Sequence, residues 1–177
     1  MLVFWEKGYE ATSIHDLEQA MGLSRTSIYN AFGCKQQLFN RILACYKESV
    51  MAELIMKMDS APTIRQGIGR LLNGALDMHF DKDNPGGCLV VQSVVESGQH
   101  DIVSQDSPMQ TLQDMKTLLQ QRLSKGKKTG ELPADLNVSS TAMTIATTMA
   151  GIMVMGKAHF TKPMLKKTIN QVLQLLG

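Results

Sequence analysis

Residues 13–35 decide the fold, and they read SIHDLEQAMGLSRTSIYNAFGCK. Ser13 and Ser24 are residue types that favour the N-cap of a helix, while Gly22 can adopt the left-handed conformation of a tight turn. The stretch therefore predicts two short helices, over about residues 13–20 and 24–32, joined by a glycine turn. This layout is typical of a helix-turn-helix.

The apolar positions of this stretch fall at spacings that let the two helices share one small core. We expect that core to contain Ile14, Leu17, Met21, Leu23, Ile28 and Phe32. Packing through these side chains would fix the crossing angle and leave the opposite face of the second helix free. The free face carries Arg25, Thr26, Ser27 and Asn30.

These four side chains are the kinds that read the major groove of DNA. Arg pairs with guanine, Asn pairs with adenine, and Thr or Ser contacts a base edge or a thymine methyl group. Positions beside helix starts suit phosphate instead, as hydroxyl donors or as a positive charge. With both roles counted, we expect DNA contacts from Thr12, Ser13, Ser24, Arg25, Thr26, Ser27, Tyr29, Asn30 and Lys35, and a double-stranded operator as the partner.

The local charge supports this prediction better than the overall charge, which is only +2. Residues 24–47 contain Arg25, Lys35, Arg41 and Lys47 and no acidic residue. A basic patch on one face is the electrostatic signature of a nucleic-acid-binding protein.

The rest of the chain predicts an all-α fold, because no segment alternates between apolar and polar residues as a strand does. Residues 81–87 form a polar loop, and residues 125–135 form a basic connector with Gly and Pro. Pro108 either kinks the helix that contains it or starts its second part. We expect helices over residues 1–7, 35–57, 62–80, 88–97, 101–124, 138–159 and 163–176.

Composition and motifs exclude several classes of protein. A hydrophobic fraction of 44% with 19% charged residues is that of a globular chain. We find no signal peptide and no apolar run near the roughly 20 residues of a membrane span, so we expect a cytoplasmic protein without a membrane partner. Phosphate loops, nucleophile elbows and metal-ligand spacings are also absent, so we expect no enzyme activity, no catalytic residue, no metal and no cofactor.

Residues 8–17, 20–24 and 27–35, with Leu38-Phe39 beyond them, resemble the DNA-binding domain of the tetracycline-repressor (TetR) family. Residues 86–90, with Glu96 and His100-Asp101, resemble a C-terminal pattern of some subgroups. The resemblance implies a nine-helix homodimer that represses transcription until a small effector moves the two DNA-reading heads apart. It implies a helix-turn-helix DNA-binding domain over residues 1–46 and a ligand-binding and dimerisation domain over residues 47–177.

The start of the chain departs from the family pattern. Family members begin with a basic arm and a full first helix, whereas this chain begins Met1-Leu2-Val3-Phe4-Trp5, so we expect either a truncated N-terminus or a weakened affinity for DNA. Glu18 stands where a small residue is usual, and Cys34 stands where Ser or Asn caps the next helix. The alternative function is therefore a dimeric helical adaptor whose truncated head does not bind DNA.

Three further sets of residues have both a functional and a purely structural interpretation. Cys88 follows Pro85-Gly86-Gly87 at a predicted helix start, where it is a candidate sensor of oxidants or electrophiles or else a small core residue. Met56, Met78, His79 and Met115 are candidates for an adaptable ligand pocket, with core packing as the alternative. The candidates for a dimer interface between the last two helices of each chain are Met149, Ile152, Met153, Leu165, Ile169, Val172 and Leu173.

Overall fold

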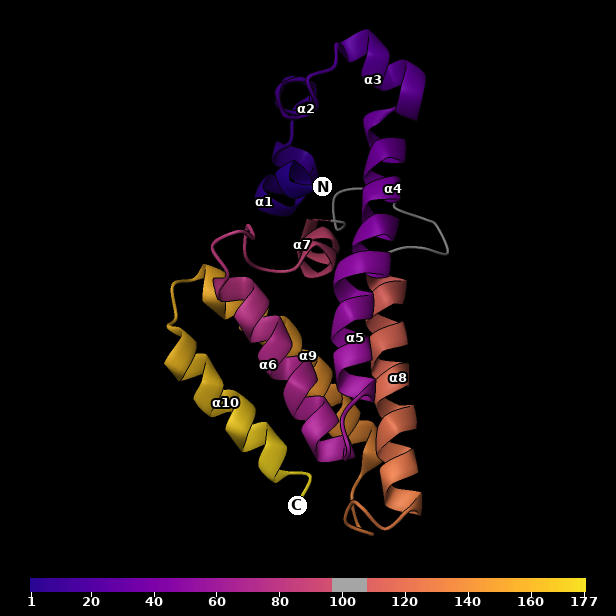
Figure 1. The fold of residues 1–177 in the computed structure, drawn as a ribbon, viewed down its shortest axis with the longest axis vertical. Coiled ribbons are helices and arrows are strands. Elements are labelled where there is room, and N and C mark those ends of the chain that lie inside the picture. The colour runs from indigo at the N-terminus through magenta and orange to yellow at the C-terminus, as the bar shows by residue number, and fades with distance from the viewer. Residues whose placement is uncertain (97–107) are drawn as a thin grey trace.

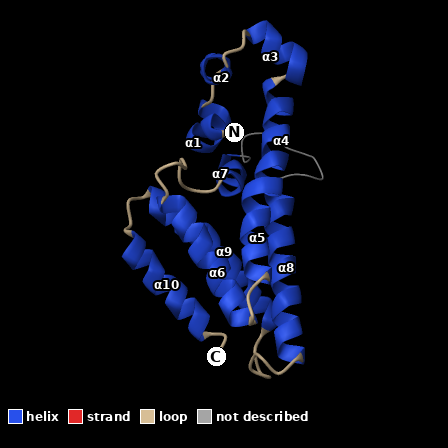
Figure 2. Cartoon of the chain, in the orientation of Figure 1, coloured by secondary structure: helices blue, strands red, loops and turns tan. Residues whose placement is uncertain are grey.

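The structure is a computed structural model that describes residues 1–96 and 108–177. Its described part contains helices and loops and no strand, which confirms the all-α prediction (Figure 2). The helices are α1 (Leu2–Ala11), α2 (Ile14–Met21), α3 (Arg25–Phe32), α4 (Lys35–Tyr46), the π-helical segment η1 (Lys47–Met51), α5 (Ala52–Asp59), α6 (Ile64–Phe80), α7 (Leu89–Glu96), α8 (Pro108–Lys128), α9 (Val138–Lys157) and α10 (Lys162–Gln174).

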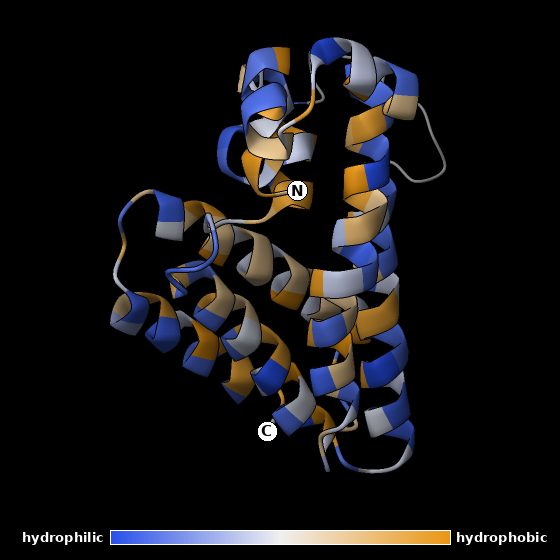
Figure 3. Ribbon diagram, turned by 45° about the horizontal axis from the view of Figure 1, so that its top comes forward, coloured by the Kyte–Doolittle hydropathy of each residue, from blue (hydrophilic) through white to orange (hydrophobic). Residues whose placement is uncertain are grey.

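One long helical column runs through most of the molecule. The backbone stays right-handed helical at Tyr46 and at Ala52, so α4, η1 and α5 follow one another without a break. This confirms the single helix predicted over residues 35–57 and adds a π-helical stretch in its middle. Bands of hydrophobic and hydrophilic residues alternate along the column, as expected of an amphipathic helix (Figure 3). If the column counts as one helix, the described residues hold nine helices.

The column joins a small head to a larger body (Figure 1). Helices α1, α2 and α3 lie beside the α4 end. At the α5 end, α6 packs against α5, α8 packs against α9, and α10 packs on α6 and α9. The head core contains Phe4, Trp5, Ile28 and Phe39, and it also includes Leu89 and Val90 of α7. The domain boundary predicted at residue 46 falls where α4 meets η1, but α7 packs on the head although it lies far along the chain.

Two helix boundaries differ from the sequence prediction. We expected the first helix to stop at Gly8, whereas α1 kinks there, at φ 83° and ψ 176°, and continues to Ala11. We expected a connector over residues 125–135, but α8 continues to Lys128, and the chain turns at Gly130, where φ is +76°. Pro108 begins α8, and the predicted helix start at Asp101 lies outside the described residues.

Helix α9 corrects the expectation that no segment is long and apolar enough to cross a membrane. By length and composition alone, its 20 residues pass that test, although core helices of soluble proteins pass it too. Only 28% of the apolar stretch of α9 is buried within the chain. This helix therefore offers an apolar surface that the single chain does not cover.

Candidate nucleic-acid interface and apolar cavity

Helix α2 is held at its start by a reciprocal capping box. The Ser13 hydroxyl accepts a hydrogen bond from the Asp16 backbone N–H at 3.1 Å, and the Asp16 carboxylate accepts one from the Ser13 N–H at 2.8 Å. Lys7 of α1 lies 2.6 Å from the same carboxylate. Lys7 and Ser13 hold the pKa of Asp16 well below its usual value, so this anchor stays charged at neutral pH.

Helix α3 is held by two acceptors at its N-terminus. The Ser24 hydroxyl accepts from the Ser27 N–H at 3.2 Å, and the Glu18 carboxylate of α2 accepts from the Arg25 N–H at 2.6 Å. Gly22 makes the turn between the two helices in the left-handed conformation, at φ 64°. Sequence reasoning noticed Glu18 only as a departure from the family pattern. The contact that locks α2 to α3 became visible only once the two helices were placed.

The outer face of α3 is open to solvent at the tip of the molecule (Figure 1). Arg25, Thr26, Ser27 and Asn30 are all exposed, whereas Ile28 on the opposite face is 1% exposed. The Arg25 guanidinium lies 5.4 Å from the centre of the half-buried Tyr29 ring, a cation–π distance. The structure thus places four of the predicted groove-reading side chains on the exposed part of one helix.

Other predicted contact residues have structural roles. Thr12 is fully buried, and its hydroxyl donates to the Gly8 carbonyl at 2.5 Å, so the phosphate contact predicted for it is wrong. Ser13 and Ser24 are exposed but serve as caps. The half-buried Lys35 places its ammonium 4.3 Å from the centre of the Tyr9 ring, which turns it toward α1.

The core of the head also differs in part from the prediction. Leu17 and Ile28 are buried as expected, but Met21 and Leu23 are 36% and 39% exposed. Their places are taken by side chains from outside the motif, namely Phe4, Trp5, Leu38, Phe39, Leu43 and Tyr46. Helices α1 and α4 supply this core because a pair of eight-residue helices has too little surface to bury by itself.

A capped helix-turn-helix with an open polar face, carried at the end of a helical body, defines the class of DNA-binding transcriptional regulators. Residues 1–42 match the tetR family of bacterial regulatory proteins, and residues 66–172 match the tetracyclin repressor-like C-terminal domain. The second match alone covers more than half of the 177 residues. The chain belongs to the tetR family.

Individual relatives agree with this assignment. The chain is 28% identical over 99 residues to YezE of Bacillus subtilis, an uncharacterized HTH-type transcriptional regulator, in a match that covers 56% of this chain and 51% of YezE. It is 26% identical over 145 residues to the HTH-type transcriptional repressor ComR of Escherichia coli. That match covers 80% of this chain and 68% of ComR. The chain therefore spans about half of the first relative and about two thirds of the second.

A solved structure extends the agreement to the whole fold. The TetR family regulator CifR, a cysteine mutant in complex with a 26-base-pair operator, superposes with a TM-score of 0.89. It is 28% identical to this chain, and the superposition covers 99% of this chain and 92% of CifR.

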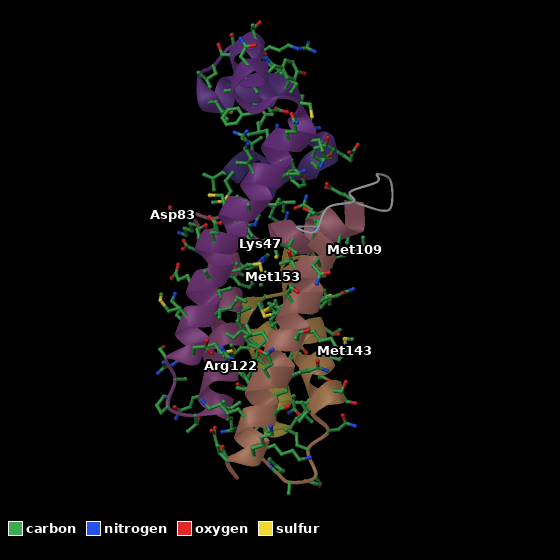
Figure 4. The ribbon with its side chains drawn as sticks, turned by 90° about the vertical axis from the view of Figure 1, so that its right-hand side faces the viewer. Lys47, Asp83, Met109, Arg122, Met143 and Met153 are labelled. Atoms are coloured by element: carbon green, nitrogen blue, oxygen red, sulfur yellow. The ribbon has the colours of Figure 1, made fainter. Side chains whose placement is uncertain are left out.

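The body contains an open-mouthed cavity of about 320 Å³ below α7, between the α4–α5 column, α6, α8 and α9. Figure 4 shows Met153 between the column and α8. Tyr46 and Cys88 line the end nearest the head. Six methionines contribute to the wall, namely Met51, Met78, Met115, Met143, Met149 and Met153.

Two of the four predicted pocket residues lie elsewhere. Met78 and Met115 line the cavity, but Met56 is 64% exposed on α5 and does not reach it. His79 instead accepts a hydrogen bond from the Gly87 N–H at 2.6 Å through Nδ1. Burial lowers the pKa of His79, and the charge of Lys157 acts in the same direction, against the hydrogen bond to the Gly156 backbone.

A line of contacts connects the cavity to the head. The Trp5 ring of α1 lies edge-on to Tyr46, with 5.0 Å between ring centres, and the Trp5 Nε1–H donates to the Gly87 carbonyl at 3.3 Å. Farther along α7, the Glu96 carboxylate accepts from the Tyr9 N–H at 2.8 Å. From the sequence, Trp5 and Glu96 stood out only in the comparison with the family pattern and Tyr46 did not stand out, because nothing in their local pattern shows that α7 packs against α1.

The predicted interface residues are mostly internal. Ile169, Ile152 and Met153 are 0%, 2% and 3% exposed, and Leu165 and Val172 reach only 6% and 7%. These five side chains pack within one chain and leave almost no surface for a partner. Only Met149 and Leu173 of the predicted set are half-buried. The apolar side chains that do remain exposed on α9 and α10 are Met143, Val154, Met155 and Met164.

Proposed function

We propose that this protein is a repressor that binds an operator through α3 and leaves it when a small effector occupies the cavity. The observation that carries the proposal is the exposed row of Arg25, Thr26, Ser27 and Asn30 on a helix whose opposite face is locked into the head. Arg25 and Asn30 suit base edges, and Thr26 and Ser27 suit either a base edge or a thymine methyl group. Tyr29 and Lys35 are assigned to phosphate, beside the capped helix starts at Ser13 and Ser24.

The repressor is tested by gel-shift titration of the DNA that flanks its own gene, at two salt concentrations. Lys35→Ala should weaken binding to every sequence and reduce the salt slope by about 1, whereas Arg25→Ala should cost about 1 to 3 kcal/mol, mainly at one base pair. Lys128→Ala, at the far end of α8, is the charge-matched control and should change neither quantity. Failure of the unaltered chain to retard any fragment would favour the helical adaptor instead.

The functional unit is a homodimer formed through α9 and α10. An exposed apolar stripe outside the cavity lining contains Val154 and Met155 of α9 and Met164 of α10, which are 52%, 38% and 51% exposed. A partner related by twofold symmetry would cover this stripe with its own copy and would present two heads to half-sites about 34 to 36 Å apart. This use of α9 also supports a cytoplasmic protein over a membrane-spanning one.

We also propose that Cys88 is a thiol sensor that controls operator binding by the same repressor. It lies directly before α7, is half-buried, lines the cavity and contacts the Tyr46 hydroxyl. Modification there would act on Tyr46, which touches Trp5 of the head. Cys88→Ser should abolish any loss of operator binding caused by an oxidant or alkylating agent, whereas Cys45→Ser, at an exposed site on α4, should not.

A further inference from the structure

The cavity has a positively charged side chain in a wall that is otherwise mostly apolar. Most of its lining is aliphatic, and no acidic residue lines it in the described part of the chain. One cation, Lys116 of α8, does line it. Lys116 is half-buried and forms no ion pair with any described residue.

The polar groups gather on one side of the cavity. Gln113 and Lys116 are three residues apart on α8, so they share a helix face, and Thr147 lies on α9, which packs against α8. At the end of the cavity nearest the head, the Tyr46 hydroxyl and the Cys88 thiol form a hydrogen bond with one another. Burial raises the pKa of Tyr46, so the phenol stays neutral. The remaining wall, including Leu54, Ala75 and Val90, offers only apolar contact.

We infer that the effector is an amphipathic monoanion, with an apolar chain or ring in the cavity and a single carboxylate held by Lys116. This inference rests on the proposed function, since it names the ligand class of the same cavity. An apolar body removes methionine and aliphatic surface from water, which drives binding. The carboxylate can accept charge-assisted hydrogen bonds from Lys116 and further bonds from the Gln113 amide and the Thr147 hydroxyl.

The size and the charge of the cavity both limit which effector can bind. At about 320 Å³ the cavity is at the small end of ligand pockets, which suits a medium-length chain better than a large polycyclic drug. A cationic amphiphile would bring its charge to Lys116, and no acidic residue among the described lining would offset the repulsion. A neutral amphiphile would gain the apolar contacts but not the ionic one.

The test compares three probes that share a ten-carbon chain: decanoate, decanol and decyltrimethylammonium. Each is titrated into the purified full chain below its micelle concentration. Binding is followed by calorimetry and by the fluorescence of Trp5, the single tryptophan, whose ring contacts the cavity residue Tyr46. At low salt, decanoate should bind about tenfold more tightly than decanol, and the cation should bind weakest.

Two variants separate the charge from the cavity. Lys116→Gln should raise the Kd of decanoate about tenfold and leave that of decanol within about twofold. Lys128→Gln removes one lysine from the same helix outside the cavity and should change neither value. Equal binding of decanoate and decanol, undiminished decanoate binding to Lys116→Gln, or no binding of any probe would overturn the inference. These binding measurements contain no DNA, so they fail or succeed independently of the repressor assay.

Discussion

The contact between α1 and α7 can be tested at Gly8, where the backbone has φ 83° and ψ 176°. This region is essentially restricted to glycine, because a side chain there collides with the backbone. A Cβ atom at Gly8 would overlap the Glu96 carboxylate and would lie 2.6 Å from Gln92 Nε2. Gly8→Ala should therefore both strain α1 and displace the carboxylate that accepts the Tyr9 N–H.

The cost follows from these two effects. The backbone strain is worth about 1 to 3 kcal/mol, and loss of a hydrogen bond to a charged group is worth about 1.5 to 3 kcal/mol. Together they predict that Gly8→Ala lowers the free energy of unfolding by about 2.5 to 6 kcal/mol. Gly22→Ala is the matched control, because Gly22 is also left-handed, at φ 64°, but a Cβ there meets nothing within 4 Å. It should cost only about 1 to 2 kcal/mol.

The assay is urea unfolding at one fixed protein concentration, since the stability of a dimer depends on concentration. In a Glu96→Ala background the overlap with the carboxylate disappears and the flexible Gln92 side chain can move aside, so Gly8→Ala should then cost mainly its backbone strain, about 1 to 3 kcal/mol. Operator affinity should fall with Gly8→Ala, because α1 carries Lys7, the partner of Asp16 in α2. A Gly8→Ala variant that is no less stable than Gly22→Ala would refute this account of the α1–α7 contact.

Three more expectations follow from single contacts. Glu18→Ala should weaken operator binding by a similar factor on all sequences, because Glu18 orients α3 through the Arg25 backbone N–H. Glu18→Gln keeps an acceptor and should retain most of the affinity. A loss of affinity confined to one base pair in gel shifts would contradict this role. The pKa of His79 in the folded chain lies below 6.5, so the free energy of unfolding should keep the contribution of neutral His79 above pH 6.5 and lose it as the pH falls through the folded-state pKa. His79→Asn keeps an acceptor and should flatten this acid dependence in urea titrations, and an unchanged pH profile would count against the role of the ring. Met155→Glu should convert the dimer to monomers in sedimentation velocity, whereas Met56→Glu, at an even more exposed methionine on α5, should leave it dimeric.

Local patterns were enough to predict the helix-turn-helix and most helix boundaries. Ser13, Ser24 and Thr63 are N-caps whose side chains accept backbone hydrogen bonds as their residue types predict, and Gly22 makes the tight turn. These features depend on interactions within three or four residues, so the sequence pattern carries them directly. The exposed face of α3 was predictable for the same reason, since helical periodicity separates its buried and open sides.

Features that depend on distant segments were not predictable in the same way. The Trp5 Nε1–H donates to the Gly87 carbonyl, 82 residues along the chain, and no local pattern at Trp5 predicts that contact. Met56 and Met78 are both methionines on amphipathic helices, yet only Met78 faces the cavity. Periodicity shows that a helix has an apolar face but not which neighbour will cover it.

The sequence by itself determined the all-α class, the capped helix-turn-helix and the side chains that α3 presents to solvent, because each depends on short-range spacing and residue type. Only the tertiary structure decided that α7 packs on α1, that Tyr46 and Cys88 meet at the end of a cavity, and that Ile152 and Ile169 are core residues while Val154 and Met155 remain exposed. The physical reason is that burial is a property of packed pairs of elements, and an apolar side chain carries the same signal whether its partner lies in its own chain or in another.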